Sequence, residues 1–383
     1  MRTQSFPDLF RALCVVPLLG TFMIDNARSA DVRIPLVMPI TGFLSVEGGS
    51  QRNGALLALE RAPSGVKVTH EIYDTGTSAT GAASALDKAL SARPAPIAAA
   101  TSVFGTEMLA MMPIAKEFKV PLMTISGLST ITESGNPYIF RFLPNDREIK
   151  VAHARYVVEK MQKKKVALVG DLTAYGQGGF KLLQEYFNKL GAKPVLEESV
   201  APDAKDMSPL LRKIRDSGAD VIVIHTVAQP MALIVKQARA SAIDLPIVTS
   251  SSLVEPHITA LFEPKELGGV CAETPSVPEA RPTPEMRAWA DAYKAKFGIE
   301  PDGLALGQYD GVMLALTLIA GGADTSEKLI AGFHNTTYKG VAMTYKSNGK
   351  GDMAHDADIV CWSGTSRIPS IAAHYAGEEL ILK

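Results

Sequence analysis

The sequence predicts an α/β protein made of two doubly wound lobes. Short apolar runs alternate with segments of helical periodicity from residue 31 onward, and this alternation restarts after a break near 143–146. Strands that alternate with helices of ten or more residues form βαβ units and parallel sheets. Each half carries its own set of strands, and a proline-rich stretch at 275–286 suits a crossing between lobes. A chain of 383 residues therefore favours two lobes over one long sheet.

The expected elements follow in chain order. The first half is predicted to have strands at 32–38, 66–73, 97–100 and 120–125, with helices covering 54–59, 80–90 and 108–118. After the break, the pattern predicts helices at 149–161, 179–190, 208–217 and 231–240, and strands at 166–169, 195–200, 221–225 and 247–249. Helical patterns return at 286–297 and 304–320, and short strands and turns are expected from Tyr338 to the end.

The first thirty residues have the character of a secretory signal. Arg2 and Arg11 flank a short polar start, residues 12–24 form an uncharged and mostly apolar run, and a polar stretch ends at Ala30. Such a run is too short to span a bilayer as a helix but suits the hydrophobic region of a signal peptide. A buried N-terminal helix is the alternative. We expect an exported protein that is cleaved near Ala30.

Charge and cysteine content narrow the class of protein further. Lys and Arg total 39 against 40 for Asp and Glu, without a basic stripe, which argues against nucleic-acid binding. After removal of residues 1–30, only Cys271 and Cys361 remain. Although an oxidising compartment permits them to pair, two cysteines in a long chain are no disulfide framework. The sequence therefore favours two free buried thiols.

A search for catalytic motifs finds none that is convincing. The seven histidines are dispersed, and the chain has no HExxH, G-x-S-x-G or Walker A motif. Residues 175–179 (YGQGG) follow a strand and open a helix, but they lack the G-x-G-x-x-G spacing of a dinucleotide loop. His225 ends an apolar strand, where a buried structural histidine is expected. We predict that the protein is not an enzyme and uses no cofactor or metal.

Small polar residues collect just past the predicted strands. In open α/β sheets, ligands bind outside the carboxyl ends of the strands, and free N–H groups at the following helix starts favour a carboxylate. Helix caps and turns use the same residue types, so any single cluster has an ordinary structural explanation. Recurrence at equivalent strand ends favours a binding cleft. The clusters are Thr41-Gly42, Thr101-Ser102 with Gly105-Thr106, residues 126–130 (SGLST) and residues 250–252 (SSS).

At these positions and others the chain resembles the type I periplasmic binding proteins of ABC importers, in the branch that binds leucine, isoleucine and valine. The resemblance covers nearly all of the chain after residue 30, and the order and spacing of its pieces are what make it specific. The pieces are 39–42 (PITG), 53–55 (NGA), 73–74 (YD), 113–115 (PIA), 120–122 (VPL), 136–141 (NPYIFR), 173–178 (TAYGQG), 236–239 (KQAR), 292–298 (AYKAKFG) and 309–310 (YD).

The resemblance implies two Rossmann-like lobes joined by three crossings and closing on a solute. Lobe one would comprise 31–148 plus 276–337, and lobe two 149–275 plus 338–383. In amino-acid binders of this family, hydroxyl-bearing residues at the third helix and in the loop after the next strand hold the α-carboxylate. The matching positions here are Gly105 and Thr106, and the loop of Leu128, Ser129 and Thr130. Lobe two would add Tyr175, which would cover the ligand, together with Ala228 and Ser251.

Two departures from the family pattern concern the ligand. The acid that binds the ammonium group should follow the strand ending at Thr249, where this sequence has Ser250-Ser251-Ser252. The aromatic residue expected in the first loop is replaced by Glu47. A buried ammonium without a carboxylate partner is costly. Either Glu47 supplies the charge from the other lobe, or the ligand has no ammonium group.

The expected function is solute binding for transport. The resemblance implies a periplasmic monomer that binds a small carboxylate-bearing solute and delivers it to a membrane permease. The expected solute is an amino acid with an apolar side chain, and an aromatic or other organic carboxylate is the alternative. The same fold could also serve as an extracytoplasmic sensor that presents its ligand to a receptor.

Overall fold

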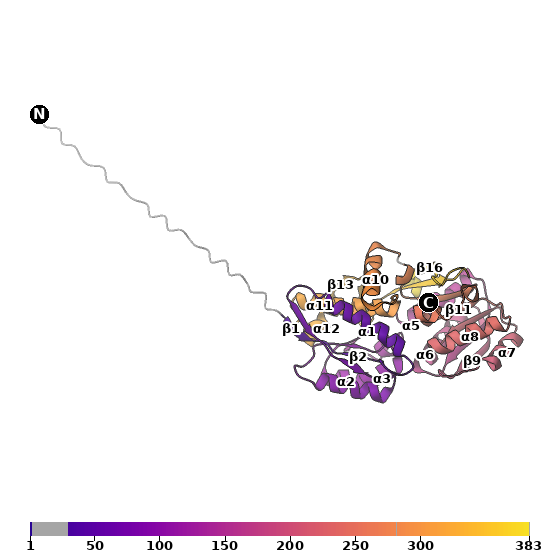
Figure 1. Ribbon diagram of the computed structural model, residues 1–383, viewed down its shortest axis with the longest axis horizontal. Coiled ribbons are helices and arrows are strands. Elements are labelled where there is room, and N and C mark those ends of the chain that lie inside the picture. Colours follow the sequence, from indigo (N-terminus) through magenta and orange to yellow (C-terminus); the bar gives the residue numbers. More distant parts are fainter. Residues whose placement is uncertain (2–29, 281, 383) are drawn as a thin grey trace.

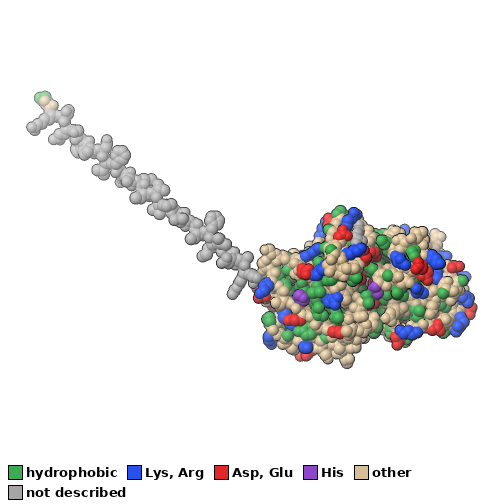
Figure 2. All heavy atoms as spheres, in the orientation of Figure 1, with side chains coloured by type: hydrophobic (Ala, Val, Ile, Leu, Met, Phe, Trp, Pro, Cys, Tyr) green, Lys and Arg blue, Asp and Glu red, His purple; other side chains and the backbone are tan. Residues whose placement is uncertain are grey.

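The computed structural model describes Met1, residues 30–280 and residues 282–382. The predicted signal segment therefore lies almost wholly outside the described residues. Two α/β bodies lie side by side in Figure 1, one built around β2 and the other around β8–β11. On the face shown in Figure 2, acidic and basic side chains are interspersed over both bodies.

The first lobe is built on a five-stranded sheet with the order β4-β2-β5-β6-β7, in which every pairing is parallel. A separate parallel pair joins β1 to β3. The single strand predicted at 32–38 is interrupted at Pro35, which has no N–H to donate to the ladder. The bounds are β1 Ala30–Arg33, β2 Leu36–Met38, β3 Val66–Thr69, β4 Ile72–Asp74, β5 Ala99–Thr101, β6 Leu122–Thr124 and β7 Ile139–Arg141.

Helices cover both faces of this sheet, as the predicted doubly wound class requires. Leu36 and Met38 of β2 belong to a core shared with α1, α10, α11 and α12, whereas Val37 belongs to a core shared with α2 and α3. Successive residues of a strand point to opposite faces, so the two cores lie on opposite sides of the sheet. The helices are α1 Ser45–Glu60, α2 Ala79–Ser91, α3 Gly105–Phe118, α4 Thr130–Glu133, α10 Pro284–Phe297, α11 Gly303–Ala320 and α12 Ser326–Asn335.

Helix α11 is the one helix in the described part of the chain that is long and apolar enough to cross a membrane. It is mostly buried in the first-lobe core and packs along α1. Gly54 allows this close approach, because a Cβ at that position would collide with the backbone carbonyl of Ala305. The apolar character of α11 is thus explained by its position in a protein core.

The second lobe has a seven-stranded sheet with the order β16-β15-β12-β11-β10-β8-β9. The pairings from β9 to β12 are parallel, and β15 and β16 are antiparallel. Its strands are β8 Lys165–Asp171, β9 Lys193–Val200, β10 Val221–His225, β11 Ile247–Thr249, β12 Val270–Thr274, β15 Asp356–Cys361 and β16 Ser370–Ala376.

Helices again cover both faces of the sheet. One core is shared with α5, α6 and the π-helical turn η1, and the opposite core with α7 and α8. The bounds are α5 Asp146–Arg155, η1 Tyr156–Lys160, α6 Ala174–Lys189, α7 Ser208–Asp216 and α8 Ala228–Ala240. Shorter pieces follow at η2 Ser251–Leu253, α9 Pro256–Thr259, η3 Pro264–Leu267, η4 Pro278–Ala280 and η5 Gly377–Leu380.

The chain passes between the two sheets three times. The first passage joins β7 to α5, the second joins β12 to α10, and the third leads from the hairpin β13–β14 (Thr337–Lys339 and Thr344–Lys346) to β15. The hairpin packs on the first lobe, where Tyr345 is fully buried in that core. Met353 and Ala354 also belong to that core, so the return to the second lobe occurs after Ala354, later than the boundary predicted at 337/338. An ion pair at 2.8 Å between Arg141 and Asp352 ties the first passage to the third.

Cys271 and Cys361 form a disulfide, which corrects the expectation of two free thiols. They lie directly opposite one another on the antiparallel strands β12 and β15, with their Cα atoms 4.0 Å apart. The register of this pairing brings the two sulfurs together. The number of cysteines in the sequence carried no information about that register.

Candidate functional site

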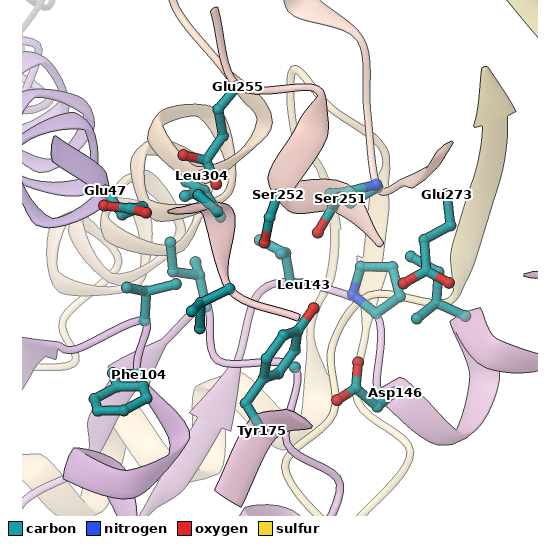
Figure 3. Close-up of a pocket in the computed structure, with 18 of the residues that line it drawn as sticks. Glu47, Phe104, Leu143, Asp146, Tyr175, Ser251, Ser252, Glu255, Glu273 and Leu304 are labelled. Atoms are coloured by element: carbon teal, nitrogen blue, oxygen red, sulfur yellow. The ribbon is translucent and has the colours of Figure 1, made fainter. Parts of the chain in front are cut away.

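A cavity lies between the two sheets and is lined by residues of both lobes; with the solvent space at its mouth it encloses about 670 Å³. Apolar side chains form most of its wall, and carboxylates lie at two places along it (Figure 3). The lining residues are Leu44, Glu47, Val103, Phe104, Ile125, Gly127, Leu143, Pro144, Asp146, Ile149, Tyr175, Val227, Ala228, Ser251, Ser252, Glu255, Glu273, Pro275 and Leu304.

The first of these places joins Glu47 to Glu255. Glu47 comes from the first turn of α1 in the first lobe, and Glu255 comes from the loop after β11 in the second, where it is the N-cap residue of α9. Only 6% of Glu47 and 5% of Glu255 is exposed. Their carboxylates and the imidazole of His257 each offer an atom within 4.8 Å of the others. Oε2 of Glu255 has no hydrogen-bond partner among the described residues.

Burial and crowding shift the protonation of both acids. Burial raises the pKa of Glu47 to about 7, and the nearby carboxylate of Asp302 adds to the effect. Burial likewise raises the pKa of Glu255 well above its usual range, and the charges of Glu47 and Asp302 raise it further. Two ionised carboxylates at this spacing repel each other in a dry site. A cation between them would relieve that repulsion.

His257 limits the kinds of cation that fit. Burial lowers its pKa to about 4, so the imidazole is neutral near pH 7 and presents a lone pair. Two carboxylate oxygens and one imidazole nitrogen could hold a divalent metal ion. However, His257 does not line the cavity, whereas Glu47 and Glu255 do. A solute in the cavity can therefore reach the two acids directly, and an ammonium group matches their charge.

Tyr175 forms another wall of the cavity. It lies in the first turn of α6, which is capped by the side chain of Thr173. The ring of Tyr175 packs on that of His225 with 4.2 Å between their centroids, and Nε2 of His225 lies 3.1 Å from the carbonyl oxygen of Tyr175. Burial lowers the pKa of His225 well below its usual range, so the ring is neutral. The predicted structural role of His225 agrees with this arrangement.

Two helix starts also face the cavity. Helix α3 begins after Phe104 and α8 begins after Val227, and neither N-cap residue makes a side-chain capping hydrogen bond. Phe104, Val227 and Ala228 all line the cavity. Uncapped N–H groups and the positive end of the helix dipole favour an anionic group at such positions. The site therefore provides for a carboxylate as well as for a cation.

The second group of carboxylates lies at the far end of the cavity from Glu47 and consists of Asp146 and Glu273 (Figure 3). Both are buried beside Lys150, whose ammonium group contacts the carboxylate of Glu273 and lies 3.7 Å from that of Asp146. Asp146 begins α5 directly after the first passage between lobes, and Glu273 lies near the end of β12 before the second.

The structure brings together some of the residues predicted for the site and not others. Glu47, Tyr175, Ala228 and Ser251 line the cavity. Phe104, which precedes Gly105, and Gly127, which precedes Leu128, also line it. The predicted carboxylate-binding residues do not line it, so their roles stay predictions; they are Gly105, Thr106, Leu128, Ser129 and Thr130. Among these, Leu128 and Ser129 are buried, Thr106 is partly buried and Thr130 is exposed; Gly105 packs closely against the side chain of Leu128.

The acid on the second lobe was not predicted from the sequence. An acid was expected directly after β11, where Ser250 to Ser252 offer no carboxylate. Glu255 is three residues further along, and η2 turns the chain so that its carboxylate enters the cavity. The available signal was that Glu255 is the first acidic residue after the strand ending at Thr249.

Comparison with known proteins places this architecture in a family. Residues 31–366 match the family model described as "Periplasmic binding protein". The chain belongs to this family, and its relatives lie in the branched-chain amino acid branch of the type I periplasmic binding proteins that serve ABC transporters.

Curated relatives come from several bacteria. An "Amino acid binding protein" of Pseudomonas aeruginosa is 31% identical over 203 residues, so the match spans 52% of this chain and 53% of that protein. A leucine-, isoleucine-, valine-, threonine- and alanine-binding protein of the same organism is 23% identical over 94% of this chain and 96% of its own.

Solved structures share the fold across nearly the whole chain. A leucine-binding protein from Thermotoga maritima aligns with a TM-score of 0.83 and 24% identity, covering 91% of this chain and 99% of its own. A solute-binding protein from Rhodopseudomonas palustris, in complex with 3,4-dihydroxybenzoic acid, aligns with a TM-score of 0.81 and 20% identity over 91% and 97%. These likenesses establish the fold of two lobes around a cleft.

Proposed function

We propose that this protein is the exported solute-binding subunit of an ABC importer and that its ligand is an amino acid. The observation that carries the proposal is the pair of buried carboxylates, Glu47 from the first lobe and Glu255 from the second, on one cavity. An α-ammonium group between them would supply one positive charge and donate hydrogen bonds to both. The ligand carboxylate would then accept hydrogen bonds from the uncapped start of α3 or α8.

Such a ligand would drive closure of the cleft. It touches both lobes at once, so it binds the closed form better than the open form and shifts the population toward closure. The closed monomer would then deliver the solute to the permease. No bond is made or broken in this cycle.

An aromatic carboxylate suits the cavity less well. Its wall carries Glu47, Asp146, Glu255 and Glu273, and no Lys or Arg lines it among the described residues. A ligand with a carboxylate and no positive charge would add a further negative charge to this set. Only the uncapped starts of α3 and α8 could then stabilise the negative charge of the ligand.

The decisive experiment compares each amino acid with the acid that lacks its α-amino group. The full chain is expressed with export, purified from the periplasm and refolded to remove carried-over ligand. Leucine is then paired with 4-methylpentanoate, and lysine with 6-aminohexanoate, in thermal-shift and calorimetric titrations. A ligand at 100 times its Kd adds about 2.7 kcal/mol to the stability, which is readily visible.

We expect binding of an amino acid and weak or no binding of its deaminated partner. Glu255→Gln and Glu47→Gln should each weaken binding, whereas Glu117→Gln, an exposed acid on α3, serves as the matched control. Binding of aromatic carboxylates alone would overturn the amino-acid class. If chelation by EDTA removed all binding, the acid pair and His257 would instead hold a metal ion.

Export and delivery need separate tests. The mass of the periplasmic protein should correspond to a chain that starts near Asp31 and elutes as a monomer. Deletion of the gene should abolish high-affinity uptake of the bound amino acid by the cells. Unchanged uptake with loss of a ligand response would favour the sensor function.

A further inference from the structure

Asp146 lines the cavity at the opposite end from Glu47 and Glu255 (Figure 3). Only 3% of the residue is exposed, and its Oδ2 has no hydrogen-bond partner in the part of the chain that the structure describes. A buried acceptor without a partner is costly, and more so when it is charged. In a binding protein, we expect the ligand to supply the hydrogen-bond donor that Oδ2 of Asp146 lacks.

The position of Asp146 is held firmly by its surroundings. Its N–H donates to the carbonyl oxygen of Gly127 at 2.9 Å, and the side chain of Asn145 caps the helix that it begins. Gly127 also allows the close approach of the carboxylate, because a Cβ at that position would lie 2.7 Å from Oδ1. The carboxylate is thus fixed against Gly127 in the wall of the cavity.

Lys150 does not neutralise this end of the cavity. Its ammonium group contacts Glu273 and lies 3.7 Å from Oδ1 of Asp146, so one positive charge is shared by two carboxylates. The second oxygen of Glu273 lies 2.9 Å from Nδ1 of His153. Burial lowers the pKa of His153 well below its usual range, so that ring is neutral. Burial raises the pKa of Asp146, whereas the charges of Lys150 and Arg141 oppose this rise. When both acids are ionised, Lys150 can balance only one of their two negative charges.

Both ends of the cavity are thus acidic, and the side chains of Leu143, Tyr175, Ser251 and Ser252 lie between them (Figure 3). A solute that satisfies both ends needs two separate groups that donate hydrogen bonds and carry positive charge. A methylene chain between these groups would contact Leu143 and the ring of Tyr175.

We infer that Asp146 binds a second positively charged nitrogen of the solute, so that the ligand is a basic amino acid rather than an apolar one. This inference rests on the proposed function, in which Glu47 and Glu255 hold the α-ammonium. The side-chain ammonium or guanidinium group donates to Oδ2 of Asp146. An apolar side chain would exclude water from Asp146 without replacing its hydrogen bonds, and this loss sets the selectivity.

The test compares ligands that differ only in the second nitrogen. Lysine and norleucine have the same carbon chain, and norleucine lacks the terminal ammonium. Calorimetric titrations of the refolded protein should show that lysine, ornithine or arginine binds at least tenfold more tightly than norleucine. Asp146→Asn should weaken the basic amino acid at least tenfold and leave norleucine unchanged. Glu255→Gln should weaken both, because it acts on the shared α-ammonium.

Three results would contradict the inference. Norleucine or leucine could bind as tightly as every basic amino acid, or Asp146→Asn could weaken lysine and norleucine equally. Absence of binding by any amino acid or diamine would overturn both the inference and the proposed function. The probe 1,5-diaminopentane, which is lysine without its carboxylate, separates the two. If this diamine binds through Asp146 while no amino acid binds, the result supports a cation site at Asp146 and contradicts the proposal that the ligand is an amino acid. The melting temperature of Asp146→Asn without ligand shows whether the variant is folded.

Discussion

Gly179 lies against the imidazole of His225 so closely that a Cβ on residue 179 would collide with Nε2 of that ring. The same Nε2 approaches the carbonyl oxygen of Tyr175, and the two rings pack against each other with 45° between their planes. The glycine in the first turns of α6 therefore sets how deeply His225 and Tyr175 sit beside the cavity. This gives the YGQGG segment a structural role, in place of the nucleotide-binding role that its position could have indicated.

Gly179→Ala is expected to displace His225 and Tyr175 and to weaken ligand binding. The added methyl must push the buried ring, at a cost of about 1–3 kcal/mol in unfolding free energy for such overpacking. Calorimetry and urea unfolding measure the two effects. Gly49→Ala is the matched control, since a Cβ there meets nothing within 4 Å and alanine favours a helix. Equal behaviour of both variants would contradict this role for Gly179.

The binding of a cationic ligand should depend on pH through Glu47. Burial raises its pKa to about 7, so below that pH the carboxyl is protonated and its attraction for an ammonium group is lost. Protonation of Glu47 is expected to raise the Kd by about tenfold per pH unit below pH 7. Calorimetry between pH 5.5 and 8.5 measures this slope. Glu47→Gln should flatten it, and a slope that persists in this variant would assign the titration to another group.

The same group affects folding of the ligand-free protein in the opposite sense. Its folded pKa lies above the usual value of 4.5, so its stabilising contribution is full below pH 4.5 and is lost as the pH rises through 7. The shift corresponds to about 3 kcal/mol in unfolding free energy. Urea unfolding of wild type and Glu47→Gln at pH 5 and pH 8 should show that the variant loses less stability at the higher pH.

Much of the fold could be predicted because its signals are local. The alternation of strands and helices is present in each short segment, so both sheets and most helices were expected within a few residues. The strands β7 and β12 and the helix α12 were not among the expected elements. The return of the chain to the second lobe was placed too early, because the packing of Tyr345 in the first-lobe core depends on tertiary contacts.

The candidate site was harder to predict because it depends on which residues meet across the cleft. Glu47 was identified from a departure from the family pattern, which is visible in one chain. Glu255 and Asp146 were missed, since each enters the cavity through the turn of a loop or a helix start. The disulfide was missed for a similar reason, because it depends on the register of β12 against β15.

Removing the disulfide should lower stability without changing the ligand. Cys271 and Cys361 are 90 residues apart in sequence, so their link restricts a long loop of the unfolded chain. By the loop-closure estimate, the double variant Cys271→Ser, Cys361→Ser should lose about 4.6 kcal/mol of unfolding free energy. The cysteines do not line the cavity, so the Kd should be unchanged. Alkylation of the unreduced, unfolded periplasmic protein at either cysteine would contradict the disulfide.

The buried pair of Arg141 and Asp352 should stabilise the connection between the lobes more than any surface pair does. Arg141 also donates to the carbonyl oxygens of Ser126, Gly127 and Leu128, so it fixes the loop that supports Asp146. Asp352→Asn leaves the guanidinium buried without its counter-charge, and we expect a loss of about 3–5 kcal/mol in unfolding free energy.

The charge on Arg141 also predicts how this variant responds to pH. Although burial opposes ionisation of Asp352, Arg141 and neighbouring hydrogen bonds lower its pKa below the usual value of 3.8. Its contribution is therefore present above pH 3.8 and lost as the pH falls through the lowered pKa, so wild type and Asp352→Asn should converge in acid. Urea unfolding at pH 7 and pH 3 measures this. Asp324→Asn breaks the exposed pair with Lys328 and should have no measurable effect at either pH. If both variants behaved alike, the buried pair would have no special role in holding the lobes together.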